Sequence, residues 1–168
     1  IATMQYMPRV QALLAAPGVT FENAFVTEPQ CCPSNVTMLT GQYAHNHGVL
    51  NNLYPTGGFQ TFVENGGDQS TIATWLQDAG YNTARVGKYL VQYPDGTNYV
   101  PPGWNEWYSS YDGFTSYFNY RMNENGAVVQ YGAEEEDYIT DVFTAKAVDF
   151  IDRAEANDDQ PFFLTFTP

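Results

Sequence analysis

The residues in this sequence best suited to chemistry lie in the run Cys31-Cys32-Pro33-Ser34-Asn35-Val36-Thr37-Met38-Leu39-Thr40-Gly41. Pro33 suits the first position of a helix, and the Ser34 hydroxyl can accept hydrogen bonds from the free N–H groups of a first turn. Those N–H groups and the helix dipole attract anions. Cys31, directly before them, is therefore a candidate nucleophile for a negatively charged substrate.

Lys88 is the second residue that the pattern singles out. Residues 81–86 are typical of a buried strand, so Gly87 and Lys88 follow at its carboxyl end. Open α/β sheets build their sites at that end of their strands. We therefore predict that Lys88 lies beside Cys31, as the only lysine or arginine near the pocket.

The Cys31 run resembles the signature of the type I sulfatases, which is Cys-x-Pro-Ser-Arg followed by an apolar run and Leu-Thr-Gly, with Asn35 in place of the arginine. The similarity is to the N-acetylglucosamine-6-sulfatase and heparan-sulfatase branch, and it continues in order through residues 42–52, 70–80, 87–90, 99–104 and 138–141. The resemblance implies an alkaline-phosphatase-like α/β domain with a mostly parallel sheet and flanking helices. It also implies that residues 1–168 are a partial catalytic domain, incomplete at both ends.

The resemblance further implies the chemistry. Cys31 would be converted to formylglycine, whose hydrate attacks sulfur and is a ligand of a calcium ion. Lys88 would contact the sulfate and stabilise charge near the leaving group. The substrate would be a sulfated sugar or an aryl sulfate. Two alternatives stay open: a phosphomonoester or phosphonate hydrolase on the same scaffold, and a catalytically silent fragment or paralogue with a binding or structural role.

Asn35 stands at a substrate-binding position of the signature. Asparagine has neither the charge nor the bidentate fork of a guanidinium, which favours the silent alternative. The acidic pairs that hold calcium in the family have no matching position in this sequence, which favours it as well. Asn35-Val36-Thr37 is also an Asn-x-Thr sequon, so Asn35 is a candidate glycosylation site. A glycan there would block the pocket, and an unused sequon is the favoured interpretation.

Composition limits the partners and the location. The chain has 168 residues, 43% of them hydrophobic, and a net charge of -13 from six basic and nineteen acidic residues. One domain with a good core fits this length, and nucleic acid is excluded because its binding needs a basic footprint. The two cysteines are adjacent, so no disulfide framework is expected, and neither a signal peptide nor a membrane span is visible. The resemblance implies a secreted or lysosome-like location, with the remainder of a sulfatase chain as a possible partner.

The predicted elements alternate between helices and strands. Helices are expected at residues 8–15, at 70–79 with Ser70 as cap and Gly80 as stop, and from the acidic run 134–137 to residue 151. Strands are expected at 19–26, 82–86 and 162–166, and a hairpin pairs 117–122 with 127–131.

Several polar and aromatic groups have two possible roles. Residues 89–117 form an irregular region whose Trp104, Trp107, Tyr108 and Tyr111 could stack on a sugar or pack in a core. His45 and His47 are too few for a zinc site and are interpreted as packing groups. Cys32 is expected to be a small buried hydrophobe. The acidic run is assigned to a helix start in preference to a metal.

Overall fold

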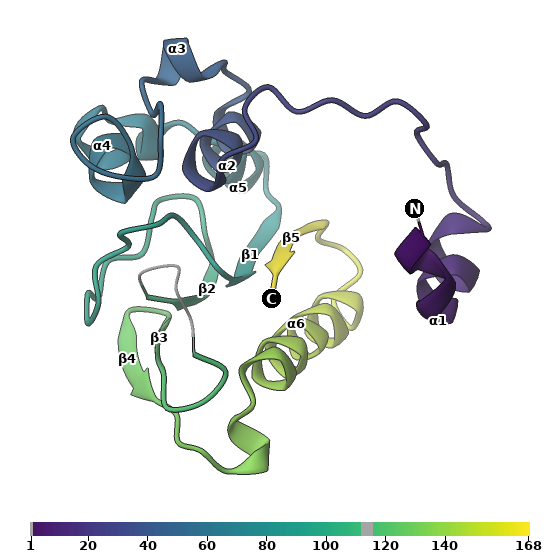
Figure 1. The fold of residues 1–168 in the computed structure, drawn as a ribbon. Helices are drawn as coiled ribbons and strands as arrows, with labels where there is room; N and C mark the ends of the chain where they lie inside the picture. The colour runs from purple at the N-terminus through teal and green to yellow at the C-terminus, as the bar shows by residue number, and fades with distance from the viewer. Residues whose placement is uncertain (1, 112–115) are drawn as a thin grey trace.

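The computed structural model describes residues 2–111 and 116–168, and it confirms the α/β class with helices on both sides of a sheet. Five strands lie in the order β4-β3-β2-β1-β5 (Figure 1). The strands are β1 (Asn82–Gly87), β2 (Glu106–Ser110), β3 (Arg121–Glu124), β4 (Ala127–Gln130) and β5 (Phe162–Thr167). β1 runs parallel to β2 and β5, whereas β2, β3 and β4 are antiparallel neighbours, so the sheet is mixed.

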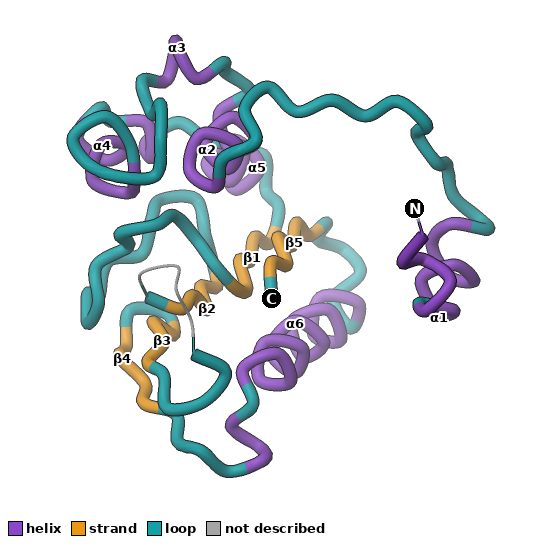
Figure 2. Tube along the Cα trace, viewed as in Figure 1, coloured by secondary structure: helices purple, strands orange, loops and turns teal. Residues whose placement is uncertain are grey.

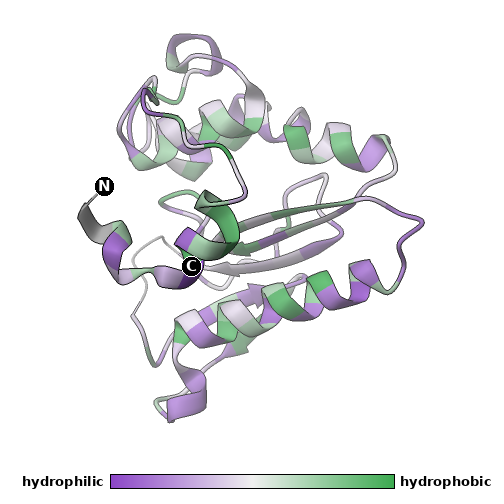
Figure 3. Ribbon diagram, turned by 90° about the vertical axis from the view of Figure 1, so that its right-hand side faces the viewer, coloured by the Kyte–Doolittle hydropathy of each residue, from purple (hydrophilic) through white to green (hydrophobic). Residues whose placement is uncertain are grey.

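Helices cover the two faces of this sheet unequally. One face carries α2 (Cys31–Thr40), α4 (Gly58–Glu64) and α5 (Ile72–Asp78), and the other carries α6 (Ile139–Glu155) (Figure 3). The short helices are α1 (Pro8–Val10), α3 (Ala44–His47) and the 3-10 or π turns η1 (Ala2–Tyr6), η2 (Gln11–Ala15), η3 (Gly67–Gln69) and η4 (Glu135–Asp137). Among helices of the described residues, none has both the length and the apolar character needed to cross a bilayer.

The N-terminal segment lies apart from the sheet. The helix predicted at residues 8–15 is present as α1 and η2, and a long loop joins it to α2 (Figure 2). The strand predicted at 19–26 is wrong, because no strand is assigned to these residues. Val19, Phe21 and Phe25 are each more than 75% exposed, at 82%, 77% and 91%. Without a neighbouring strand or a face to cover, their β propensity does not produce pairing.

Two further elements differ from expectation. The strand β2 was not predicted, because its aromatic and polar residues lack a clear alternation and lie within the irregular region. The helix predicted at 70–79 has Thr71 in place of Ser70 as its N-cap, so α5 begins at Ile72. Thr71 and Thr74 cap each other reciprocally. Ser70 instead accepts a hydrogen bond from the indole of Trp75, at 3.1 Å.

The predicted hairpin is confirmed with a tighter turn. β3 extends to Glu124, so only Asn125 and Gly126 connect it to β4. Both residues have positive φ, at 53° and 88°. Two residues in this conformation make the type I′ turn that Asn-Gly favours, and this turn matches the twist of the strands it joins.

The aromatic residues of the irregular region pack in the core. Trp104, Trp107 and Tyr111 are buried, and Tyr108 is half-buried. The Trp107 indole donates to the Tyr93 hydroxyl at 3.2 Å, and its ring meets Tyr89 edge to face at 4.9 Å. The packing alternative therefore describes Trp104, Trp107 and Tyr111, and half-buried Tyr108 donates its hydroxyl to Glu106 at 3.0 Å. Residues 112–115 of the region lie outside the described part of the chain.

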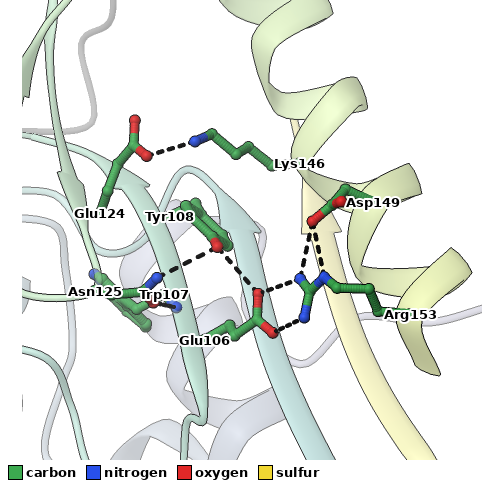
Figure 4. Close-up of polar contacts among 8 residues, drawn as sticks. All are labelled: Glu106, Trp107, Tyr108, Glu124, Asn125, Lys146, Asp149 and Arg153. Carbon is green, nitrogen blue, oxygen red and sulfur yellow. Dashed lines mark hydrogen bonds and ion pairs between the residues drawn. The ribbon is translucent and has the colours of Figure 1, made fainter. Parts of the chain in front are cut away.

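An ion pair connects the C-terminal part of α6 to the strand β2. Arg153 donates to both carboxylate oxygens of Glu106 on β2, at 2.7 and 2.8 Å, and also pairs with Asp149 (Figure 4). The Arg153 side chain is 50% exposed and that of Glu106 is 16% exposed. Partial burial and the bidentate geometry distinguish this pair from an ordinary surface pair.

Replacing Arg153 by methionine is expected to lower the free energy of unfolding by about 0.5–1 kcal/mol, and by less at high salt, because the pair is screened. Urea unfolding at two salt concentrations measures this. Arg121→Met is the matched control, since Arg121 pairs with Asp95 where both side chains are about half exposed. An Arg153→Met effect no larger than that of the control would contradict the prediction.

Candidate functional site

The helix α2 places Cys31 at its first position. It begins two residues before Pro33, which a first turn tolerates because its N–H groups have no partner within the helix. Ser34 does not cap it, contrary to the expectation. The Asn52 side chain accepts a hydrogen bond from the Cys32 N–H at 2.8 Å instead. A cap from a residue 20 positions away could not be read from the local sequence.

Cys31 and Lys88 lie side by side. The Lys88 Nζ is 3.5 Å from the Cys31 Sγ, across 57 residues of sequence. Cys31 is exposed and Lys88 is half-buried. The Lys88 N–H donates to the Thr167 carbonyl at 2.8 Å, so the neighbouring strand β5 fixes the backbone that presents the ammonium group. The arrangement places a positive charge next to an accessible sulfur atom at a helix N-terminus.

The neighbouring cysteine has a different environment. Cys32 is fully buried, as predicted, and its sulfur accepts a hydrogen bond from the Val91 N–H at 3.2 Å. Burial raises the pKa of Cys32, so this thiol stays neutral and unreactive. Of the two adjacent thiols, only Cys31 can therefore meet a substrate.

A cavity of about 500 Å³ opens beside Cys31. α2 contributes Cys31, Ser34 and Asn35 to its wall, and the sheet contributes Arg85, Phe163 and Thr165. The prediction that Lys88 is the only cation near the pocket is therefore wrong, because Arg85 lines it. The sequence carried a signal for this, namely an arginine between Ala84 and Val86 in an otherwise buried strand.

Arg85 is buried almost completely, with 1% of its surface exposed. Its Nη2 donates to the Lys88 carbonyl at 2.6 Å, and its guanidinium lies 5.0 Å from the centre of the Tyr89 ring. Its Nε has no acceptor among the described residues. Burial lowers the pKa of Arg85 to about 10, which still leaves it protonated at neutral pH.

Asn35 is half-buried one turn after Cys31 and lines the same cavity. Its Nδ2 approaches the Tyr89 carbonyl at 3.5 Å, a long hydrogen bond. A glycan on this nitrogen would replace that contact and enter the cavity. Asn35 therefore lies near Cys31, as the signature places it, but its amide is directed to the backbone after Lys88.

The described residues do not form a metal centre. They contain no group of three or more histidine, cysteine or acidic side chains that could hold an ion, and no acidic side chain among them lines the cavity. Calcium takes six to eight oxygen ligands, so the described residues do not fit a calcium ion. Glu134 and Asp137 of the acidic run cap η4 just before α6. His47 is buried and accepts a hydrogen bond from the Val49 N–H, whereas His45 is exposed and stacks on Tyr43.

Comparison with known proteins gives consistent results. The family model described as Sulfatase matches residues 2–168. A putative extracellular sulfatase Sulf-1 homolog of Caenorhabditis elegans is 41% identical over 98% of this chain and 23% of its own length. The human N-acetylglucosamine-6-sulfatase is 35% identical over 96% of this chain and 30% of its own length.

Solved structures share the fold. One, a protein in complex with its substrate D-glucosamine-2-N,6-O-disulfate, has a TM-score of 0.71 and 27% identity over 96% of this chain and 28% of its own. The crystal structure of Ps i-CgsB has a TM-score of 0.68 and 28% identity over 88% of this chain. The chain thus spans about a quarter to a third of the length of these relatives.

Proposed function

Because this chain belongs to the sulfatase family, we propose that the native protein containing it hydrolyses sulfate esters of sugars or aryl alcohols at the Cys31 site. The observation that carries the proposal is the 3.5 Å approach of the Lys88 Nζ to the Cys31 Sγ. Two residues far apart in sequence meet at the end of a strand, where α/β sheets bind their ligands. The relatives named sulfatases at 35–41% identity support the reaction class.

The residues of the site have different roles in this proposal. Lys88 attracts the negatively charged ester and stabilises charge that develops on the leaving oxygen. The free N–H groups at the start of α2 favour the same anion. Cys31 marks the position of the group that attacks sulfur, since it is exposed at the helix N-terminus.

We propose that Cys31 is converted to formylglycine, which supplies a hydrated aldehyde as nucleophile once formed. Its exposure and its position beside Lys88 fit this modification. Asn35 is the departure, because its amide cannot make the charged bidentate contacts of an arginine. Mass spectrometry of the peptide spanning Cys31 tests the conversion, with buried Cys32 in the same peptide as the internal reference.

We propose a calcium ion at this site only for the native protein that contains this chain. The described residues offer no acidic cluster for it, so any ligands must come from elsewhere in that protein. Calcium titration of the protein monitored by calorimetry tests this, and absence of binding would favour the silent alternative.

Replacing Lys88 by alanine is expected to lower kcat/KM for an aryl sulfate by about 10²–10³-fold, because a preorganised charge next to the reacting group is lost. Lys146→Ala is the matched control, since Lys146 is the other lysine of the chain and pairs with Glu124 on the α6 face. The rates of both variants are measured with the native protein on the sulfate ester and on the matching phosphate ester.

The outcomes separate the alternatives. Hydrolysis of the sulfate ester that depends on Lys88 supports the proposal. Faster hydrolysis of the phosphate ester would assign the site to phosphomonoesters. No hydrolysis of either ester, together with an unmodified Cys31 thiol, would identify a silent relative.

We further propose an extracellular or lysosome-like location. Relatives described as extracellular sulfatases, in Caenorhabditis elegans and Drosophila melanogaster, support it. The net charge of -13 fits a protein that stays soluble in such a medium. Fractionation of cells that express the native protein tests the location.

A further inference from the structure

Arg85 is a buried charge for which the described residues provide no counter-charge. Every ion pair found among the described residues involves Arg121, Lys146 or Arg153, so none of them neutralises Arg85. Its Nε lacks an acceptor, and one backbone carbonyl is the hydrogen-bond partner found for the guanidinium. Taking a cation out of water costs several kcal/mol unless it is paired, so an arginine in this state needs an explanation.

The position of Arg85 in the sheet supplies one. Arg85 pairs in register with Thr165 of β5, and both residues line the cavity beside Cys31. Of the described residues that line this cavity, Arg85 alone is charged. Lys88 follows directly after β1, three residues beyond Arg85. Its backbone carbonyl accepts a hydrogen bond from the Arg85 guanidinium. The guanidinium thus lies in the cavity wall, whereas Lys88 lines a smaller neighbouring cavity and contacts Cys31 through its ammonium group.

We propose that Arg85 is an anion-binding residue of this site, and that its guanidinium holds an oxygen of the sulfate group whose ester Lys88 and Cys31 address. The inference rests on the proposed function for the identity of the anion. A guanidinium has five N–H donors in a rigid fork and binds tetrahedral oxyanions with more than one of them. The bound anion would supply the acceptor and the counter-charge that the described residues do not provide.

The proposal also bears on Asn35. The signature position occupied by Asn35 lacks a positive charge here, and Asn35 and Arg85 line one cavity from opposite sides, α2 and β1. The positive charge that Asn35 does not supply from α2 is thus supplied by Arg85 from β1. Arg85 supplies the second cation of a site whose other cation is Lys88.

A structural role is the competing explanation. Arg85 could serve only to hold the Lys88 carbonyl and to pack on Tyr89. That role predicts a loss of stability on replacement with no change in the intrinsic affinity for an anion. The two roles therefore differ in a binding measurement.

The test is titration of the protein with sodium sulfate, against sodium chloride at matched ionic strength, observed through the Nε–H resonances of arginine by NMR. The Arg85 resonance is identified by its absence from Arg85→Met, a variant of similar side-chain length. We expect a saturable shift of this resonance with sulfate. We also expect the Kd for sulfate to rise about tenfold or more in Arg85→Met, the loss typical of a charge-assisted hydrogen bond.

Arg121→Met is the matched control, because Arg121 is exposed and pairs with Asp95, and its Kd should stay within about twofold of the parent value. An unshifted Arg85 resonance at saturating sulfate, or an unchanged Kd in a folded Arg85→Met variant, overturns the inference. If that variant fails to fold, Arg85→Lys identifies the Arg85 resonance instead, and the response of this resonance to sulfate in the parent protein decides. A protein that binds sulfate through Arg85 but hydrolyses no sulfate ester would contradict the proposed function and leave the inference about Arg85 intact.

Discussion

Replacing Trp107 by alanine is expected to lower the free energy of unfolding by about 3–5 kcal/mol, which is a large part of the stability of a domain this size. Trp107 is fully buried on β2, at the centre of the core between the sheet and the helices α2 and α4. Its removal leaves a cavity and deprives the Tyr93 hydroxyl of the indole N–H at 3.2 Å. Denaturant unfolding followed by circular dichroism measures the loss.

Trp75→Ala is the matched control for this change. Trp75 lies on α5 with 48% of its surface exposed and donates its indole N–H to Ser70. We expect a loss of less than about 1 kcal/mol, as for most exposed positions. Equal losses for the two tryptophans would show that the burial of Trp107 is not what stabilises β2.

Replacing Gly87 by alanine is expected to cost at least about 2 kcal/mol and to displace Lys88 from Cys31. Gly87 has a φ of +116°, a conformation that residues with a side chain rarely adopt. A Cβ atom there would lie 2.1 Å from the Thr167 carbonyl oxygen, so the end of β1 would have to separate from β5. Because the next residue is Lys88, the same shift should weaken sulfate binding.

Gly80→Ala separates the two contributions. Gly80 also has positive φ, at +89°, but a Cβ atom there meets no neighbour within 4 Å. Its replacement should carry only the backbone cost, about 1–2 kcal/mol, and leave the Kd for sulfate unchanged. Urea unfolding and sulfate titration of both variants measure the difference. A Gly87→Ala variant no less stable than Gly80→Ala would contradict the close contact seen between β1 and β5.

The sequence predicted those parts of the fold whose signals are local. The helix α6 follows from its apolar stripe, β5 from a short apolar run, and the β3–β4 turn from Asn125-Gly126. It failed where structure depends on distant partners. Residues 19–26 have strand-forming side chains but no strand to pair with, and β2 has a weak pattern but is held between β1 and β3.

The candidate site shows the same division. Cys31 at a helix start and Lys88 at a strand end could both be placed from the sequence, and their contact follows from the way such ends meet. The cap from Asn52 and the entry of Arg85 into the cavity wall could not, since both depend on the tertiary arrangement. The roles proposed for Cys31, Asn35 and Lys88 stay predictions until the variants are measured.

The pairing of β1 with β5 has a consequence for how reliably the site assembles. Six residues of each strand pair in register, from Asn82 with Phe162 to Gly87 with Thr167. A slip by one residue would turn every side chain of β1 to the opposite face. The Arg85 guanidinium would then enter the apolar cluster beneath α6, where Val86 now packs, and Val86 would face the cavity. A misaligned chain would thus remove the guanidinium from the Lys88 carbonyl and from the cavity where we propose that an anion binds, so Arg85 also selects against the wrong strand alignment.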